Sequence, residues 1–550
     1  MGLKEAVALA EAITASSVAI AAIVLAATWP VFPETILIVE WLLLMVFVGG
    51  ERLLFRIWRE RTAKKAEAGV RGKRLLIVGA GDASETIIRE IDKNPKLGYQ
   101  PVACVDDDRR KLGRNLYQVP VLGTTEDIPD LVSQHHIEEI VIAIPAASGA
   151  EMRRIVEQCE RSRVRFRTLP ALHELIAGDI IFSQIREVQI EDLLGREPYA
   201  EDLRGVASYL TGARVLVTGA GGSIGSELCR QIAIYEPEEL ILFDWGENSI
   251  YQAELELRQK FPALNMEIVV GDIQNQARVD EVMKAHRPTV IFHAAAHKHV
   301  PLMELNPGEA VLNNITGTRV LVQAADRYGV DRFVFISSDK AVNPTSVMGT
   351  TKRIGEAMIQ CKASVSQTRF AAVRFGNVLG SQGSVVPLFK RQIAQGGPIT
   401  VTHPEATRYF MTISEAVQLI IQAAGLGRGG EIFLLDMGRP VKILDLAKDM
   451  IRLSGLEEGD IEIKLIGLRP GEKLCEELLT IEEEVSATVH RKIFVARPNS
   501  VEATQLWQEL EELEELALGS DAEAIKRKLK QIVPGYQPAP SPAVSQEVRL

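Results

Sequence analysis

Short aliphatic runs alternate with segments of helical periodicity through most of this chain. In residues 72–195 the pattern predicts strands at Lys73–Val78, Pro101–Val105, Glu139–Ile144 and Val164–Thr168, and helices at Ala83–Ile91 and Ala150–Arg161. In residues 196–530 it predicts strands at Val215–Val217, Leu240–Phe243, Ile268–Val270, Thr289–Phe292 and Phe333–Ile336. Such alternation is typical of parallel sheets that carry helices on both faces. We therefore predict an α/β protein with two doubly wound parallel-sheet domains in tandem.

Residues 1–71 depart from this pattern. No charged residue occurs in Ala12–Pro33, and that run is long enough to cross a bilayer core of about 30 Å. A second apolar stretch, Thr35–Gly50, is shorter and contains Glu40, so one or two transmembrane helices fit. Basic residues then gather in Arg52–Arg74, and the positive-inside rule places such charge in the cytoplasm. We expect a membrane anchor with a basic linker at the inner membrane, and both soluble domains facing the cytoplasm. A signal peptide or a buried helix is the alternative.

Three glycines at regular spacing follow the first strand of the second domain, and a helical segment comes next. Strand, glycine-rich turn and helix in this order predict a Rossmann-like dinucleotide fingerprint. Glycine lets the backbone turn tightly and approach a pyrophosphate, while the helix N-terminus offers free N–H groups to it. The residues expected at the pyrophosphate are Gly219, Gly222, Ser223, Ile224 and Gly225.

The ends of the neighbouring strands supply further cofactor candidates. The strand Leu240–Phe243 leads to Asp244, whose carboxylate can accept hydrogen bonds from the adenosine ribose and repel a 2′-phosphate. This favours NAD over NADP. Additional contacts are expected at two strand ends with small neighbouring residues, namely at Asp272, Ile273, Ala294 and Ala295.

The first domain has a weaker version of the glycine turn. Gly79-Ala80-Gly81 follows the strand Lys73–Val78, but Ser84 occupies the place of the third glycine or alanine. A lone G-x-G is weak evidence for a nucleotide, and the acidic Asp106–Asp108 is explained equally well as a solvated strand end. A structural or regulatory role for this domain is therefore an equally good interpretation, and no ligand is predicted for it.

The motif that indicates most about chemistry follows the strand Phe333–Ile336. Asp339 and Lys340 are adjacent and offer an acid and a base at the end of that strand. The segment looks like an oxidoreductase active site whose usual tyrosine is replaced by Met348, and a thioether cannot transfer a proton. Lys352 lies four residues after Met348, on the same helical face.

Six motifs in order carry a family resemblance over residues 213–480. They are Thr218–Gly225, His293–Pro301, Ser337–Lys340 with Asn343-Pro344, Met348–Lys352, Arg374–Val378 and Arg469–Lys473. With these motifs the chain resembles the extended short-chain dehydrogenase/reductases. Within them it resembles the membrane-associated UDP-N-acetylglucosamine 4,6-dehydratases of bacterial polysaccharide and glycoprotein synthesis. The long members of that group also carry methionine at this position, but they usually have four transmembrane helices.

The resemblance implies NAD-dependent dehydration of a nucleotide sugar. C4 is oxidised, a base removes the C5 proton, an acid protonates the departing C6 hydroxyl, and the hydride returns at C6. Asp339 is implied as the acid and Lys340 as the base, which requires the pKa of Lys340 to fall well below its usual ~10.4. Lys352 is implied at the nicotinamide ribose, and Ser338 or Ser337 at the C4 oxygen. Asp339, a water and Lys352 acting through the ribose all remain open as acceptors of the C4 hydroxyl proton.

The same resemblance implies a set of substrate contacts, namely Lys298, His299, Asn377, Arg408, Arg469 and Glu472. The forked donors of Arg408 suit a phosphate, although a surface salt bridge is the alternative for each arginine. No metal is expected, because the neighbouring histidines lack acidic or cysteine ligands at a zinc spacing.

The net charge and the cysteine content bear on the possible partners and on the cell compartment. The net charge of −11 gives no indication of a nucleic-acid partner, and five scattered cysteines without a C-x-x-C pair fit buried thiols in a reducing cytoplasm. Leu506–Ile532 predicts two amphipathic helices packed on the catalytic domain, and residues 531–550 predict a disordered, proline-rich tail. The expected partners are a UDP-sugar, the membrane and further copies of the chain in a homo-oligomer. A 4-epimerase and a membrane-tethered nucleotide sensor without turnover are the alternative functions.

Overall fold

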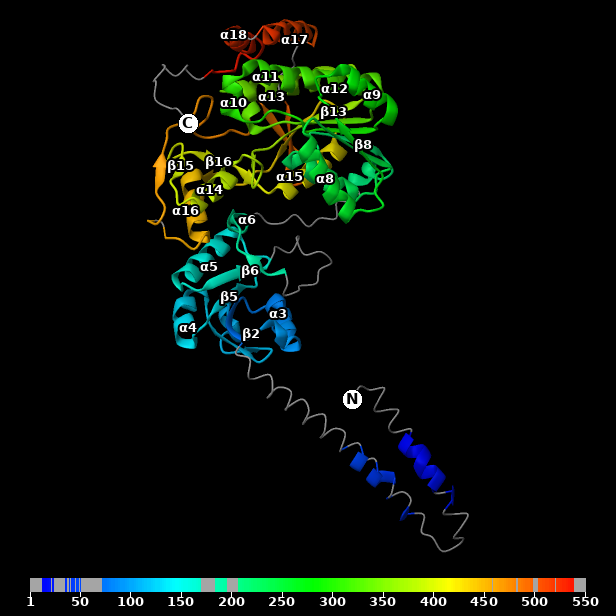
Figure 1. The fold of residues 1–550 in the computed structure, drawn as a ribbon, viewed down its shortest axis with the longest axis vertical. Helices are drawn as coiled ribbons and strands as arrows, with labels where there is room; N and C mark the ends of the chain where they lie inside the picture. Colours follow the sequence, from blue (N-terminus) through cyan, green and yellow to red (C-terminus); the bar gives the residue numbers. More distant parts are fainter. Residues whose placement is uncertain are drawn as a thin grey trace. The chain divides into compact units, whose positions relative to one another are not determined.

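The computed structural model describes residues 12–20, 22–23, 35–36, 39, 41–44, 46–48, 50, 72–169, 184–194, 206–457, 459–480, 483–497, 503–519 and 521–538. The chain forms two compact units (Figure 1). The first unit contains strands β1 to β6. The second unit extends from Glu187 onward and also includes Pro145–Glu160.

The first unit is built on a mainly parallel sheet with the strand order β3-β4-β2-β1-β5-β6-β7. Its elements are β1 (Lys73–Val78), α3 (Asp82–Lys93), β2 (Tyr99–Val105), β3 (Asn115–Leu116), β4 (Val119–Gly123), α4 (Ile128–His135), β5 (Glu139–Ile142), β6 (Arg165–Thr168) and, at the boundary, β7 (Arg186–Glu187). Leu75 and Ile77 of β1 pack against Ile87 of α3 in the core. The predicted strands and the first helix are confirmed, and the helix predicted at Ala150–Arg161 is α5 (Gly149–Arg161).

In the part of the N-terminal region that the structure describes, no helix is long and apolar enough to cross a membrane. Helix is described at residues 12–20 and in shorter pieces up to residue 50. Parts of Ala12–Pro33 and of Thr35–Gly50, and most of the basic linker, lie outside the described residues. The membrane anchor therefore stays a prediction.

The second unit contains a nine-stranded sheet with the order β10-β9-β8-β11-β12-β13-β18-β22-β21. The strands are β8 (Arg214–Thr218), β9 (Glu239–Asp244), β10 (Met266–Val270), β11 (Val290–His293), β12 (Arg332–Ile336), β13 (Arg369–Arg374), β18 (Ile432–Leu435), β21 (Glu484–Ala487) and β22 (Ile493–Arg497). All pairs from β10 to β18 are parallel, and β22 and β21 add two antiparallel strands. The predicted doubly wound sheet is confirmed.

Alternating side chains of these strands build two apolar layers, because successive residues of a strand point to opposite faces. On one face, Val215 and Val217 of β8 pack with helices α7 (Ser223–Ala233), α8 (Glu247–Lys260) and α15 (Ile413–Leu426). On the other face, Leu216 packs with α9 (Gln276–His286), α12 (Gly317–Arg327) and α13 (Val347–Ala363). Strand order reverses on either side of β8, and ligands bind at the carboxyl ends of the strands at such a point.

Further elements complete the second unit. They are α6 (Ile190–Leu194), α10 (Val300–Leu305), α11 (Pro307–Val311), the 3-10 turn η9 (Asp339–Ala341), β14 (Asn377–Val378), α14 (Val385–Ala394), β15 (Ile399–Val401), β16 (Thr407–Arg408), β17 (Phe410–Met411), β19 (Val441–Lys442), α16 (Ile443–Leu453) and β20 (Ile463–Leu465).

The C-terminal helices α17 (Ala503–Leu518) and α18 (Ala522–Ile532) pack on α11 and α13, as predicted (Figure 1). The expected disorder from residue 531 is wrong for residues 531–538. Tyr536 is fully buried in the apolar cluster of these helices, and the backbone N–H of Gln537 donates to the carbonyl oxygen of Pro344 at 3.0 Å. The proline-rich composition predicted disorder, because it gave no indication that Tyr536 packs into the core. Residues 539–550 lie outside the described residues.

Candidate active site

The glycine-rich turn joins β8 to α7 and brings its backbone against the segment after β11. Gly219 has a φ of 70°, and a Cβ there would lie 2.6 Å from the backbone nitrogen of Ala295. A Cβ on Gly225 would overlap the carbonyl oxygen of Gly219. Glycine is therefore required at both positions. The close approach keeps the N-terminus of α7 open, which is the geometry that a dinucleotide pyrophosphate needs.

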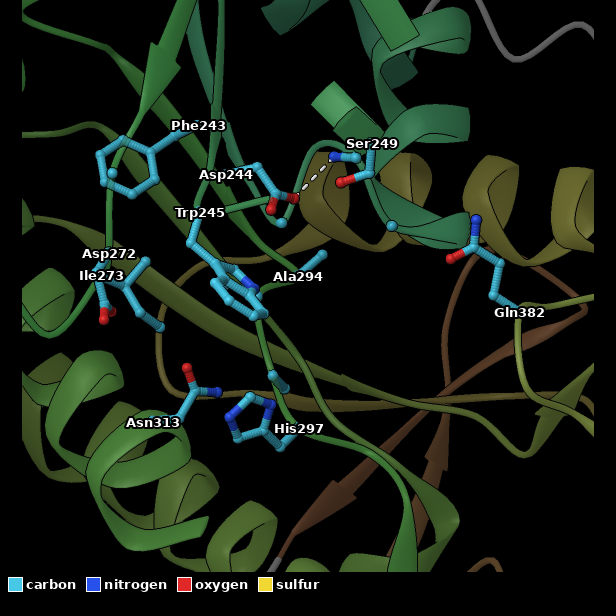
Figure 2. A pocket seen from close by; sticks show the side chains of 16 residues that line it. Phe243, Asp244, Trp245, Ser249, Asp272, Ile273, Ala294, His297, Asn313 and Gln382 are labelled. Atoms are coloured by element: carbon cyan, nitrogen blue, oxygen red, sulfur yellow. Dashed lines mark hydrogen bonds between the residues drawn. The ribbon is translucent and has the colours of Figure 1, made fainter. Parts of the chain in front are cut away.

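Asp244, the last residue of β9, ties this turn to the neighbouring strand. Its Oδ2 accepts a hydrogen bond from the backbone N–H of Gly221 at 2.9 Å (Figure 2). Its Oδ1 accepts one from the backbone N–H of Gly246 at 2.8 Å. Asp244 is buried but lines a cavity of about 200 Å³, the cofactor pocket. The carboxylate therefore orders the turn at the place where the sequence predicts the adenosine ribose.

Most of the predicted cofactor contacts meet in the cofactor pocket. The lining includes Gly219, Gly222, Asp244, Asp272, Ile273, Ala294 and Ala295. Ser223, Ile224 and Gly225 are not in the lining but form the first turn of α7. Figure 2 shows several lining residues that the sequence analysis did not predict as cofactor contacts, among them Trp245, Asn313 and Gln382. Trp245 is 73% exposed. It directly follows Asp244, and this position in the sequence could have indicated that it lies at the cofactor pocket.

In the first unit, Asp106, which pairs with Lys111, likewise holds the corresponding glycine turn. Its Oδ2 accepts hydrogen bonds from the backbone N–H of Ala80 at 2.7 Å and from Nζ of Lys111 at 2.8 Å. Ser84 donates its hydroxyl to the carbonyl oxygen of Gly79 at 2.8 Å. The protein's own side chains thus order this turn, and these contacts do not indicate a particular ligand.

Asp339 and Lys340 stand at the start of η9, directly after β12. Oδ1 of the buried Asp339 accepts hydrogen bonds from the hydroxyl of Ser338 and from Nζ of Lys340, both at 2.9 Å. Nζ of Lys340 also donates to Oδ1 of Asn377 at 3.0 Å. Oδ2 of Asp339 is buried and has no hydrogen-bond partner among the described residues. One carboxylate oxygen therefore holds the lysine and the other is unpaired, although Asp339 lines neither the cofactor pocket nor the pocket beside Lys340.

Lys340 is held in its charged form. Burial opposes the charge and is the largest single effect, but Asp339 and Glu476 together outweigh it and raise the pKa of Lys340 above its usual value. The expectation of a lowered pKa is wrong for the protein without substrate, because two carboxylates surround the amine. Base chemistry at Lys340 therefore requires an acceptor for the ammonium proton.

Lys352 has the lowered pKa that was expected of Lys340. Its Nζ donates to the carbonyl oxygen of Ile336 at 2.8 Å and lies 4.6 Å from the ring centre of Phe335. Burial lowers the pKa of Lys352 to about 7, against the opposing effect of Glu356. The predicted contact of Lys352 with the nicotinamide ribose stays a prediction.

Met348 packs in the apolar core. Its side chain is 2% exposed and belongs to the cluster that α10, α11, α13, α17 and α18 form together. Met348 lines neither the cofactor pocket nor the pocket beside Lys340. Many short-chain dehydrogenase/reductases have a proton-transferring tyrosine at this position. In this chain the residue at this position, Met348, packs in the core instead.

A second cavity of about 220 Å³, the substrate pocket, is lined in part by Lys340. It brings together all six residues predicted to contact substrate, Lys298, His299, Asn377, Arg408, Arg469 and Glu472. Arg408 is buried, and its guanidinium donates to Oε1 of Glu472 at 2.9 Å and to backbone carbonyls of Thr407, Lys473 and Leu474. Arg408 thus shapes the loop after β20, and a phosphate contact stays a prediction.

A buried ion network joins the elements that carry the catalytic motif. Arg374, at the end of β13, donates to both oxygens of Glu356 at 2.6 and 2.7 Å and to both oxygens of Glu483 at 2.8 Å. The hydroxyl of Ser337 donates to Glu356 at 2.7 Å, and Arg353 contacts both acids. The network therefore fixes β12, α13, β13 and the segment before β21 relative to one another.

Glu476 is an acidic residue of the substrate pocket that the sequence analysis missed. It is buried, and its Oε1 lies 3.7 Å from Nζ of Lys340 and 3.8 Å from Nε of Arg408. Its Oε2 has no hydrogen-bond partner among the described residues. Glu476 lies three residues after the motif Arg469–Lys473, and this position in the sequence could have indicated that it belongs to the pocket.

The fold and the site define an α/β protein with the Rossmann-like architecture of the extended short-chain dehydrogenase/reductases. The chain belongs to the polysaccharide biosynthesis protein family, whose match covers residues 215–498. A CoA-binding domain family matches residues 3–170.

Two relatives are similar over most of the chain. The capsular polysaccharide biosynthesis protein CapD of Staphylococcus aureus is 48% identical over 459 residues, which cover 83% of this chain and 76% of CapD. The probable polysaccharide biosynthesis protein EpsC of Bacillus subtilis (strain 168) is 44% identical over 516 residues, which cover 94% of this chain and 86% of EpsC.

More distant relatives have two different activity names. A UDP-glucose 4-epimerase of Rickettsia canadensis is 35% identical over 280 residues, which cover 50% of this chain and 79% of that protein. The UDP-N-acetylglucosamine 4,6-dehydratase (inverting) of Campylobacter jejuni is 32% identical over 274 residues, which cover 49% of this chain and 78% of that protein.

Proposed function

We propose that this protein catalyses the NAD-dependent 4,6-dehydration of UDP-N-acetylglucosamine to a UDP-4-keto-6-deoxy-N-acetylhexosamine for bacterial surface polysaccharide or glycoprotein synthesis. The observation that carries the proposal is the contact between Asp339 and Lys340 at 2.9 Å, beside the substrate pocket. Water loss from C5 and C6 needs an acid and a base together, whereas a 4-epimerase moves no hydroxyl group. The similarity to a Campylobacter jejuni dehydratase supports the same reaction.

Asp339 supplies the proton path that Met348 cannot. In this proposal, the free Oδ2 of Asp339 accepts the C4 hydroxyl proton and later donates that proton to the C6 hydroxyl, which leaves as water. Lys340 removes the proton at C5 and returns a proton to C5 once the hydride has added at C6. NAD held by the glycine turn would accept the hydride from C4 and return it at C6. The proton that Asp339 takes from the C4 hydroxyl is the proton that it gives to the departing C6 hydroxyl. The elimination therefore requires no external acid.

Asp244→Ala should weaken NAD binding and relax discrimination against NADP. The variant removes the carboxylate proposed for the ribose hydroxyls and also frees the N–H groups of Gly221 and Gly246. Titration of the purified protein with each cofactor, followed by tryptophan fluorescence, measures both affinities. An unchanged preference for NAD in the folded variant would contradict this assignment.

Incubation of the purified full chain with UDP-N-acetylglucosamine tests the reaction itself. We expect a 4-keto-6-deoxy product without accumulation of reduced cofactor, because the hydride returns to the sugar. A C4 epimer would identify the epimerase alternative, which the Rickettsia relative favours. Binding of the nucleotide sugar without turnover would identify the sensor alternative.

We also propose that the chain is anchored in the inner membrane with its soluble domains in the cytoplasm. The uncharged run Ala12–Pro33 and the basic segment Arg52–Arg74 support this placement. Fractionation of cells that express the full chain tests it, since recovery in the soluble fraction would contradict an anchor.

A further inference from the structure

The proton on Lys340 is the unsolved step of the proposed reaction. Nζ of Lys340 contacts Asp339 at 2.9 Å and Asn377 at 3.0 Å, and a third group, Glu476, lies 3.7 Å away. Asn377 cannot accept a proton at neutral pH. Asp339 is already assigned to the protons of O4 and O6. Glu476 is thus the one acid next to the lysine that the proposed mechanism does not use, among the residues that the structure describes.

We propose that Glu476 accepts the proton that Lys340 must lose before it acts as the base at C5. This inference rests on the proposed function. The N–H bond of the Lys340 ammonium breaks and an O–H bond forms on the carboxylate of Glu476, so an ion pair becomes a neutral pair without any change in total charge. Glu476 acts through Lys340 and touches no reacting atom of the sugar, so it is a positioning residue.

The surroundings of Glu476 suit this exchange. Its side chain is 3% exposed, and one of its oxygens has no hydrogen-bond partner among the described residues. The titratable groups that face it are Lys340, Asp339, Arg408 and Lys473. Burial, the largest effect, and the charge of Asp339 raise the pKa of Glu476, while the three cations oppose the rise. A substrate that fills the pocket removes further water from the pair, which favours its neutral form.

The exchange predicts a characteristic pH profile. In the wild type, the ion pair and the neutral pair hold the same number of protons, so kcat should change little around neutral pH. In Glu476→Gln the ammonium proton must leave to solvent instead. The kcat of this variant should therefore be low at neutral pH and rise about tenfold per pH unit until the pKa of Lys340 is reached.

The experiment compares full-length wild type, Glu476→Gln and Glu476→Asp with UDP-N-acetylglucosamine between pH 6 and about 10. Dividing the kcat of each variant by that of the wild type at the same pH cancels the effect of groups that titrate in all three proteins, such as Lys352. We expect this ratio to rise with pH for Glu476→Gln and to stay flat for Glu476→Asp, which keeps a proton acceptor. A flat ratio for Glu476→Gln, whether near one or near zero, would overturn the proposal.

A second measurement does not depend on turnover. Competitive acetylation at a series of pH values, followed by mass spectrometry of the peptide that contains Lys340, reports the pKa of that amine. Removal of the neighbouring carboxylate should lower this pKa in Glu476→Gln but not in Glu476→Asp. An unchanged pKa in Glu476→Gln would overturn the coupling. A wild type that shows the coupling but forms no 4-keto product would instead refute the proposed function.

Discussion

Lys340→Ala and Asp339→Asn should each lower kcat by about 10²–10⁴-fold, the usual effect of removing a general acid or base. The two variants should fail at different steps. Without Lys340, no group removes the C5 proton, so solvent deuterium should no longer enter C5 of the sugar. Without the Asp339 carboxylate, the C4 hydroxyl proton has no acceptor and the C6 hydroxyl has no donor. The absorbance of enzyme-bound reduced cofactor in a single turnover separates these outcomes, because only the variant without Lys340 keeps the group that accepts the C4 hydroxyl proton and can still oxidise C4.

Met348→Leu is the matched control for this pair. The substitution keeps a similar volume in the apolar cluster and removes only a weak acceptor, so most of the activity should remain. Thermal unfolding and NAD titration establish that each variant is folded and binds the cofactor. A folded Met348→Leu protein as inactive as Lys340→Ala would require a role for the sulfur, and the proton path through Asp339 would then be abandoned.

Arg374→Met should lower the free energy of unfolding by about 3–5 kcal/mol, the usual cost of removing one partner from a buried ion pair. Arg374 is wholly buried and pairs with Glu356 and Glu483, which are 0% and 2% exposed. The variant leaves these two carboxylates with Arg353 as their remaining cation in the network. Denaturant unfolding of the wild type and the variant under the same conditions measures the difference.

Arg353→Met is the control for this second prediction. Its side chain is 27% exposed, so solvent screens its contacts and the loss should not exceed about 1 kcal/mol. Equal losses for the two variants would show that burial does not set the strength of the network.

The pH dependence of the network has a definite sign. Burial, the largest effect, raises the pKa of Glu356, but the charge and hydrogen bonds of Arg374 outweigh it, so the pKa is lowered overall from 4.5. The stabilisation by Glu356 is therefore complete above pH 4.5 and is lost as the pH falls through the lowered value. The deficit of Arg374→Met should accordingly shrink in acid.

Local signals determined much of the fold. Aliphatic strands followed by turns and helices fixed the two parallel sheets, because a run such as Leu240–Phe243 can be buried on both faces only inside such a sheet. The spacing of Gly219, Gly222 and Gly225 predicted the turn at the cofactor pocket, and close backbone approach admits only glycine at positions 219 and 225.

Only the tertiary structure decided the charge of Lys340 and the role of its neighbours. The sequence by itself determined that Asp339 and Lys340 are adjacent, but a pKa depends on every charge within a few ångströms and on the water excluded around it. Glu476, 136 residues further along the chain, enters that sphere only because the loop after β20 folds against η9. Tyr536 likewise anchors a proline-rich segment through long-range packing. Periodicity and motif spacing record local geometry, whereas these contacts arise from chain segments that only the folded protein brings together.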